Sequence, residues 1–553
     1  MLNRPNILFL MCDEKFYPPH YENDELKNWR STYLETENLL RPTCMEYHNH
    51  YTASTACSPS RASMFTGHYP PLHGVSQTDG VAKNAFEKDI YFLGANTVPT
   101  VGEYFKLNGY KSILKGKQHM AMLDLLKPGT NKSIIPYSPT TGLVNQEYKD
   151  YYLVADPMGP LGFNKWVGPD PHGISPNNSG GLSKTQTKGR DLEFADDIID
   201  TLDDLEHSCD PWFLVASFVN PHDIVFYGDY TQNFPGLDFT VDDTLPNIPL
   251  PPSIDEDLST KPSAHASYKS TYPKMFQPIT NVDKYRKLYY SFMKRGDVQQ
   301  ARVLKHIMSK PRMYNNTIII YTSDHGDALK NHGICQKWYN NYQESIHVPL
   351  IIHNPILFNK YHSTNNVTSH IDLLPTLLEM ANINPDRTLN ILQRSHTAAF
   401  PPVGRRIFIE FDRNTIRYKH DADRITEPAY FWTKDHPSKG NYQYNGVTKQ
   451  PYDPVIQPCA IESIVTYLDN GTSTHLYKYA IYFDPVNTST PNEYEMYDLT
   501  TDPGETVNLA HPSNSTPETQ SIQSQLNSLL IIQRSSKYIV SSEPINPVPI
   551  ALQ

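Results

Sequence analysis

The stretch Thr317-Ile-Ile-Ile-Tyr-Thr-Ser-Asp-His-Gly-Asp327 says most about the architecture of this chain. Its apolar run, 317–321, predicts a strand that is buried on both faces, as in a parallel sheet. An acid and a possible nitrogen ligand, Asp324 and His325, follow directly, and Gly326 permits a tight turn there. Ligand-type side chains after a buried strand predict a site at the carboxyl edge of an α/β sheet.

A second strand with the same ending lies at the start of the chain. Asn6-Ile-Leu-Phe-Leu-Met11 is a continuous apolar run, and Cys12-Asp13-Glu14 follows it. Alone, these acids could form a solvated turn. Because parallel strands end at the same edge of a sheet, the two strand ends together predict one bridging divalent cation. Its expected ligands are Asp13, Glu14, Asp324 and His325.

Strands and helices alternate up to about residue 412. Helices are predicted over 99–107, 192–205, 285–307 and 371–380, and further strands over 110–114, 212–219 and 406–411. In the first of these helices, Pro99 suits the first helical position and Gly109 the C-terminal cap. Repeated βα units predict an α/β fold with a mostly parallel sheet and helices on both faces. Two stretches, 159–181 and 233–278, are expected to be long loops, which are often functional.

The pattern of predicted strands and helices changes after about residue 412. Short strand-like pieces over 461–468 and 477–483 precede a helix with apolar residues at 522, 526, 529 and 530. We therefore expect a catalytic α/β domain over 1–412. A smaller α+β domain, with a short antiparallel sheet and a terminal helix, is expected over 413–553.

Composition excludes several classes of protein. Lys+Arg number 48 and Asp+Glu 59, for a net charge of −11, which excludes a generally basic nucleic-acid-binding protein. The 6 cysteines are scattered without a C-x-x-C pair, which argues against a zinc ribbon or a disulfide framework. The apolar run 7–12 is too short for a secretory signal or for a membrane helix of about 20 residues. We expect a soluble protein, cytoplasmic or otherwise, with no signal peptide and no membrane or nucleic-acid partner.

A cysteine motif adds a candidate nucleophile. The motif is Cys57-Ser-Pro-Ser-Arg61, and Thr66-Gly67 follows it. Alone, Cys57 could be a small buried thiol at the start of a helix. C-x-P-S-R with a downstream T-G resembles the signature of the sulfatase family. In that family the cysteine is oxidised to formylglycine, whose hydrated aldehyde is the nucleophile, so the resemblance implies that role for Cys57.

Further matches to the sulfatase family occur in the family's order along the chain. They are Asn6–Glu14, Gly116-Lys117-Gln-His119 (resembling G-K-W-H), Phe218-Val-Asn-Pro-His222, Asp324-His-Gly-Asp327 with Lys337 and Glu344 after it, Ile371–Thr376, and Met496–Leu509. The resemblance implies an alkaline-phosphatase-like fold. Three positions depart from the family: Gln118 replaces the usual Trp, Glu14 replaces a frequent second Asp, and His347 replaces a frequent Arg. Glu14 could bind the metal directly or lie just outside its ligands.

The resemblance also implies roles for the matched side chains. The expected catalytic residues are Cys57, Arg61, Lys117, His119, His222 and Lys337. Arg61, Lys117 and Lys337 would add fixed positive charge around the sulfate, although Arg61 could instead mainly orient the nucleophile. His222 or Lys337 would protonate the leaving alcohol, and His119 would hold the geminal diol and drive its collapse. Individually, Lys117 could be a surface lysine, His119 a core histidine and Lys337 a loop charge.

The expected activity is arylsulfatase-type hydrolysis of small sulfate esters, with a formylglycine-generating enzyme as maturation partner. Ca²⁺ is the expected metal, and the imidazole of His325 makes Mn²⁺ the alternative. A phosphonate or phosphate-ester hydrolase could use the same site, because these esters share tetrahedral geometry with sulfate esters. If Cys57 is not converted, the chain would be a non-catalytic, anion-binding homologue. Gln77 and Asp79 could line the substrate pocket or belong to an ordinary loop.

Overall fold

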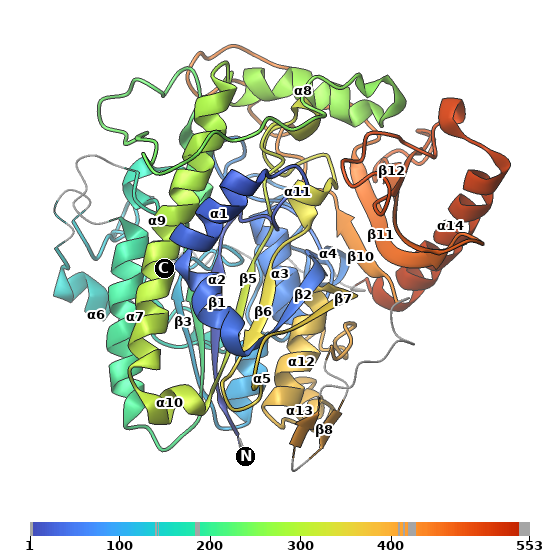
Figure 1. The fold of residues 1–553 in the computed structure, drawn as a ribbon. Helices are drawn as coiled ribbons and strands as arrows, with labels where there is room; N and C mark the ends of the chain where they lie inside the picture. The colour runs from blue at the N-terminus through green and yellow to red at the C-terminus, as the bar shows by residue number, and fades with distance from the viewer. Residues whose placement is uncertain are drawn as a thin grey trace.

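A computed structural model describes residues 4–138, 141, 143–182, 189–407, 410–412, 415–417 and 427–540. Within these residues, the main sheet has seven strands in the order β3-β4-β1-β5-β6-β2-β7 (Figure 1). The strands are β1 Asn6–Cys12, β2 Cys44–Tyr51, β3 Lys111–Gly116, β4 Trp212–Ser217, β5 Thr317–Ser323, β6 Leu350–His353 and β7 His362–Ser369. β6 runs antiparallel to both of its neighbours, and the other pairs are parallel. The predicted mostly parallel sheet is therefore confirmed.

Two helical layers cover the faces of this sheet (Figure 1). One face packs on α3 Cys57–Thr66, α5 Val101–Leu107 and α12 Leu373–Met380, and the other on α7 Arg190–Glu206 and α9 Val282–Met308. Ile7, Phe9 and Met11 of β1 enter the first core, whereas Leu8 and Leu10 enter the second. This burial on both sides explains why β1 is a continuous apolar run.

The remaining helices lie at the ends and edges of these layers. They are α1 Asp24–Tyr33, α2 Glu35–Leu40, α4 Pro70–His73, α6 Gln146–Ala155, α8 Ser263–Met275, α10 Pro311–Asn315, α11 Gln343–Ile346 and α13 Pro385–Leu392. The prediction that 233–278 is a loop is wrong for α8. This helix buries Ala264, Tyr268, Tyr272 and Met275 at helical spacing, a signal hidden by the preceding prolines and by Pro273.

Two other predictions need correction. The helix predicted from Pro99 begins at Val101, because Thr100 and Glu103 form a capping box that fixes its start. The strand predicted over 406–411, of which two residues lie outside the described part, does not join the main sheet. β8 Glu410–Asp412 pairs only with β9 Thr415–Arg417 in the described chain. The preceding backbone N–H groups of Arg405 and Ile407 donate to the side chains of Asp372, just before α12, and of Thr376, within it, and not to a strand.

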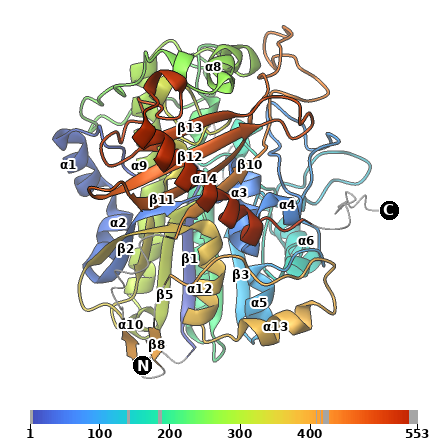
Figure 2. The same cartoon turned by 90° about the vertical axis from the view of Figure 1, so that its right-hand side faces the viewer.

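A second sheet of four antiparallel strands, counted over the described residues, follows in the C-terminal part of the chain. Its order is β10 Ala429–Thr433, β11 Ala460–Asp469, β12 Thr474–Phe483 and β13 Glu493–Asp498. Helix α14 Pro517–Lys537 packs across it through Ile522, Leu526 and Leu530 (Figure 2). The predicted short strands and terminal helix are thus confirmed, and a domain division at residue 412 stays a prediction.

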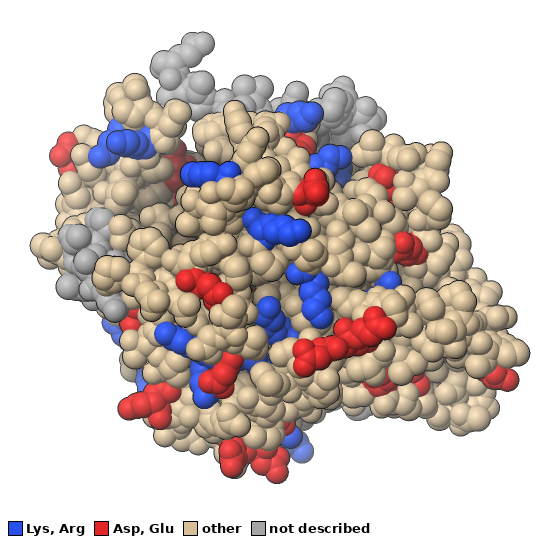
Figure 3. Space-filling view, turned by 90° about the horizontal axis from the view of Figure 1, so that it is seen from above, with Lys and Arg blue, Asp and Glu red and all other residues tan. Residues whose placement is uncertain are grey.

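The face seen from above carries side chains of both charges. Basic side chains gather along its middle, and acidic side chains lie around them (Figure 3). None of the helices in the described ranges has both the length and the apolar character needed to cross a membrane.

Candidate active site

The carboxyl ends of β1 and β5 place the predicted metal ligands side by side. These strands are parallel neighbours with their last residues in register. Asp13 and Glu14 follow β1, and Asp324 and His325 follow β5. The Glu14 backbone turns back with φ 71°, and its N–H donates to Oδ1 of Asp324 at 3.0 Å. All four side chains are buried, so the two strand ends form one enclosed cluster.

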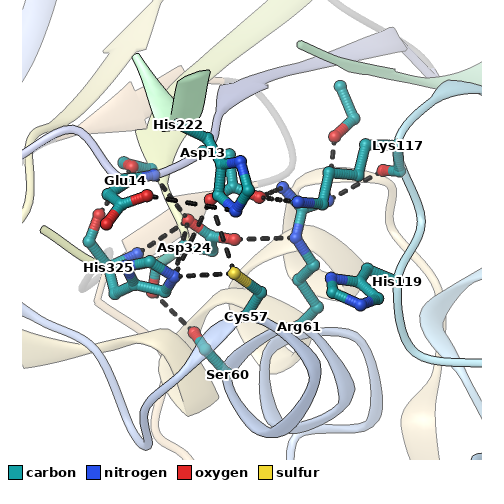
Figure 4. Close-up of polar contacts among 12 residues, drawn as sticks. Asp13, Glu14, Cys57, Ser60, Arg61, Lys117, His119, His222, Asp324 and His325 are labelled. Atoms are coloured by element: carbon teal, nitrogen blue, oxygen red, sulfur yellow. Dashed lines mark hydrogen bonds and ion pairs between the residues drawn. The ribbon is translucent and has the colours of Figure 1, made fainter. Parts of the chain in front are cut away.

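Cys57 is the first residue of α3, and its sulfur lies against this cluster (Figure 4). Sγ is 3.0 Å from Nε2 of His325 and 3.5 Å from Oδ1 of Asp13. The preceding residue, Ala56, donates its backbone N–H to Oδ2 of Asp435 at 3.2 Å, which ties the cysteine loop to the C-terminal part of the chain. The N-terminal end of a helix also favours negative charge.

Arg61 lies one turn further along α3 and connects three parts of the site (Figure 4). Its Nε donates to Oδ2 of Asp324 at 2.7 Å, and its Nη2 lies 3.2 Å from Oδ2 of Asp13. Nη1 donates to the Lys117 carbonyl at 2.8 Å and to Oγ of Ser217 at 3.0 Å. Burial opposes the charge, but the two carboxylates raise the pKa of Arg61 above its usual value. With so many donors engaged, Arg61 mainly fixes the position of α3.

Two buried lysines complete the positive side of the site. Nζ of Lys117 is 2.7 Å from Oδ2 of Asp13, and Nζ of Lys337 is 2.9 Å from Oε1 of Glu14. Burial alone would favour neutral amines, but Asp13 raises the pKa of Lys117 and Glu14 raises the pKa of Lys337. Three acidic side chains, Asp13, Glu14 and Asp324, thus face three basic ones, Arg61, Lys117 and Lys337. A divalent cation would add positive charge to the site, as an anionic ester requires.

The donor atoms fit a divalent cation. One ligand atom from each of four side chains lies within 4.8 Å of the others: Asp13, Cys57, Asp324 and His325. Oε2 of Glu14 is buried and accepts no hydrogen bond from the described residues. Burial raises the pKa of Glu14 well above its usual value, so its carboxylate would gain from a cation. Carboxylate and imidazole donors of this kind suit Ca²⁺ or Mn²⁺.

His119 lies on the other side of Cys57 from the acid cluster (Figure 4). Its Nε2 is 3.0 Å from Oδ1 of Asp79. Oδ2 of Asp79 is 3.3 Å from Nδ1 of His172, and the two imidazole rings meet edge to face with centroids 4.9 Å apart. Asp170 accepts the backbone N–H of His119 at 3.0 Å. These contacts hold His119 from both its ring and its backbone.

Asp79 also sets the protonation of the two histidines. Burial and Lys117 oppose protonation of His119, but Asp79 raises its pKa above the usual value. Burial likewise opposes protonation of His172, but Asp79 and then Asp170 raise its pKa to about 10. Sequence reasoning missed His172 and Asp170 and left Asp79 undecided. The unusual length of the predicted loop over 159–181 was the one sequence signal for Asp170 and His172.

His222 follows β4 and faces the acid cluster from above (Figure 4). Its Nε2 is 4.0 Å from Oε2 of Glu14. Burial, reinforced by Lys117, lowers the pKa of His222 well below its usual value. The structure thus gathers every predicted site residue into one buried cluster: Asp13, Glu14, Cys57, Arg61, Lys117, His119, His222, Asp324, His325 and Lys337.

A cavity of about 250 Å³ opens from this cluster. Cys57, His119, His222 and Lys337 line its inner end. The side chains that line the cavity beyond them are largely apolar. The geometry provides a nucleophile position, acids for a metal, and fixed cations at the head of a binding cavity.

Comparison with known proteins agrees with this geometry. The model of the sulfatase family matches residues 5–383. The chain belongs to the sulfatase family. An uncharacterised sulfatase of Escherichia coli K12, YidJ, is 26% identical over 442 residues, 78% of each chain. The choline-sulfatase of Rhizobium meliloti is 26% identical over 395 residues, 69% of this chain and 68% of that protein.

Solved structures share the fold of this sulfatase. A 2-O GAG sulfatase has a TM-score of 0.61 at 20% identity and covers 96% of this chain and 92% of its own. The phosphonate monoester hydrolase of Agrobacterium radiobacter has a TM-score of 0.60 at 17% identity. The match covers 97% of this chain and 96% of that one. Likeness at this identity concerns the fold alone. Family membership makes the protein a hydrolase of sulfate esters.

Proposed function

We propose that this sulfatase is of the arylsulfatase type and that its nucleophile is formylglycine made from Cys57. The position of Cys57 carries the proposal: it lies at the head of the cavity, 3.0 Å from His325 and 3.5 Å from Asp13. A hydroxyl at this position would meet both the metal ligands and the incoming ester. A thiol is poorly suited to attack the hard sulfur centre of a sulfate ester.

The converted residue would supply chemistry that a cysteine lacks. After oxidation by a formylglycine-generating enzyme, Cys57 would carry a hydrated aldehyde, of which one hydroxyl attacks sulfur and the other allows sulfate to leave. A divalent cation, Ca²⁺ or alternatively Mn²⁺, would neutralise sulfate charge and lower the pKa of that hydroxyl. Its ligands would be Asp13, Glu14, Asp324 and His325.

The charges of the site give different roles to three side chains. Lys337 lines the cavity and stays protonated because Glu14 raises its pKa, so it holds a proton for the leaving alcohol. His222 is neutral because burial lowers its pKa, and we assign it to orienting the sulfate. Asp79 faces Nε2 of His119, which leaves Nδ1 to take a proton from the group at position 57.

Hydrolysis of p-nitrophenyl sulfate by metal-loaded enzyme tests this proposal. We expect turnover, with competitive inhibition by inorganic sulfate or phosphate, because the three cations and the metal recognise a tetrahedral anion. A phenyl phosphonate monoester is the matched comparison substrate. If it is hydrolysed far faster than any sulfate ester, the phosphonate-hydrolase alternative replaces the proposal.

A further inference from the structure

The cavity has a charged inner end and an apolar outer part. Beyond the catalytic cluster, larger apolar side chains line the cavity: Val225, Phe226, Met275, Phe276 and Trp338. Loop residues complete the apolar lining, namely Val81, Ala82, Ile174, Pro176, Pro437 and Val447, and a smaller number of uncharged polar side chains lies among them, namely Thr78, Thr231, Gln277 and Gln336. Val81, Ile174 and Val447 are each more than half exposed, so apolar groups continue to the mouth of the cavity.

The volume limits what can enter. An apolar cavity of about 150 Å³ is enough to hold benzene. The observed cavity of about 250 Å³ therefore has room for a sulfate group and a small ring system. A chain of several sugar units would have to extend outside it.

The charged side chains of the outer part already have partners. Nζ of Lys83 lies 2.8 Å from Oε1 of Gln77 and 2.6 Å from Oδ2 of Asp89. The imidazole of His172, which also lines the cavity, is paired through Nδ1 with Oδ2 of Asp79 at 3.3 Å, and Asp79 lies between it and His119. A second anionic group on the substrate would lose its hydration without meeting a free cation in the described lining, which is unfavourable.

A cationic group on the substrate, like a second anionic group, does not match the aromatic side chains of the cavity, Phe276 and Trp338. Nζ of Lys337 lies over the ring of Trp338, 5.1 Å from its centroid. Phe276 stacks on Trp338 with centroids 5.6 Å apart and planes 20° from parallel. A quaternary ammonium beside Trp338 would compete with the like charge of Lys337 for the same ring. An uncharged flat group can instead extend the stack beside Phe276.

We infer that the outer cavity is a leaving-group subsite for one flat, uncharged ring system. The inference rests on the proposed function, because it takes the inner end as the sulfate site. It narrows the substrate class to monosulfated aryl or fused-ring compounds. A sulfate ester with a second anionic group, or with a quaternary ammonium, does not match the subsite.

Calorimetric binding to the Cys57→Ala variant tests the subsite without depending on turnover. The probes are phenyl sulfate, 2-naphthyl sulfate, choline sulfate and glucosamine 2-N,6-O-disulfate. The second ring of 2-naphthyl sulfate should tighten binding roughly tenfold or more over phenyl sulfate, with a more negative heat-capacity change. Tighter binding of choline sulfate or of the disulfated sugar than of 2-naphthyl sulfate would overturn the inference.

A pair of phenylalanine variants locates the effect. In the Cys57→Ala background, Phe276→Ala should remove most of the advantage of 2-naphthyl sulfate and leave the affinity for inorganic sulfate unchanged. Phe234→Ala is the control, because Phe234 is also a phenylalanine, is 56% exposed and does not line the cavity. If Phe276→Ala fails to fold, Phe276→Leu keeps an apolar side chain without the ring and should lose part of the advantage. An equal loss for every probe would overturn the subsite.

Turnover by the wild-type enzyme separates the two claims. If 2-naphthyl sulfate binds as expected but no sulfate ester is hydrolysed, the subsite stands and the proposed function fails. If phenyl sulfate is hydrolysed and the second ring brings no gain in binding or in kcat/KM, the proposed function stands and the subsite fails.

Discussion

Replacing Asp79 with asparagine changes the charge and hydrogen bonding at His119 with almost no change in shape. Asp79 is buried, and its Oδ1 lies 3.0 Å from Nε2 of His119. The carboxylate can only accept a hydrogen bond, so it holds the proton on Nε2 and leaves Nδ1 as the base. The amide of asparagine can donate instead, which would move the ring proton to Nδ1 and remove the base.

The size of the effect follows from this contact. A hydrogen bond to a charged group contributes about 1.5–3 kcal/mol, and replacing Asp79 with asparagine removes that charge. Because Asp79 raises the pKa of His119, Asp79→Asn should lower that pKa. The acid limb of kcat should then move to lower pH, since His119 acts unprotonated. The plateau of kcat should fall by roughly 10²–10⁴-fold, the range of general-base catalysis.

Two measurements on the same protein check this prediction. A pH profile of kcat reports the position of the acid limb, and ¹⁵N shifts of the His119 ring report its tautomer. Asp89→Asn is the matched control, because Asp89 is an acid in the same loop that pairs with Lys83. An unchanged tautomer and acid limb in Asp79→Asn would contradict the role of Asp79, as would an equal loss of kcat in Asp89→Asn.

Three further outcomes are expected. Cys57→Ser should release about one equivalent of leaving alcohol per enzyme and then stop, because a serine sulfate ester has no neighbouring hydroxyl to expel the sulfate. Sustained turnover by this variant would argue against the formylglycine mechanism. Chelation should abolish activity and lower Tm, by the loss of about 2.7 kcal/mol for a metal at 100 times its Kd, with recovery on Ca²⁺ or Mn²⁺; full activity without metal contradicts the site. Since the pKa of His172 is raised from 6.5 to about 10, its charge stabilises the fold fully below pH 6.5, and this stability is lost as pH rises through about 10. His172→Gln should therefore cost more unfolding free energy, measured in urea, at pH 6 than above pH 10; equal losses would disprove the charge effect.

The strands that the sequence predicts are those with two buried faces. β1 and β5 lie in the middle of the sheet, so every position is apolar or nearly so. β2 and β7 lie at one edge of the sheet and contain histidine and asparagine at partly or fully exposed positions. These two strands show neither an alternation of apolar and polar residues nor a continuous apolar run, the two patterns that predict a strand. β6 has only four residues and runs antiparallel to its neighbours. It therefore belongs to no repeated βα unit from which the sequence could predict it.

The residues of the site also differ in how far the sequence predicts them. The acids after β1 and β5 could be predicted from the residues, because strand order brings their ends together. Lys117 and Lys337 carry no local signal and were placed by family resemblance alone. The pairing of Asp79 with His172 could not be predicted by either route. These residues come from two loops without periodicity, and only the packing of those loops around His119 joins them.

The chemical state of residue 57 in an active preparation is the most informative single observation. Mass spectrometry of the peptide that ends at Arg61 distinguishes a thiol from an aldehyde or its hydrate, and a carbonyl-reactive probe labels only the latter. We expect an aldehyde or hydrate at position 57, in a fraction that rises and falls with specific activity. Full sulfatase activity in a preparation that carries only unmodified Cys57 would contradict the proposed nucleophile.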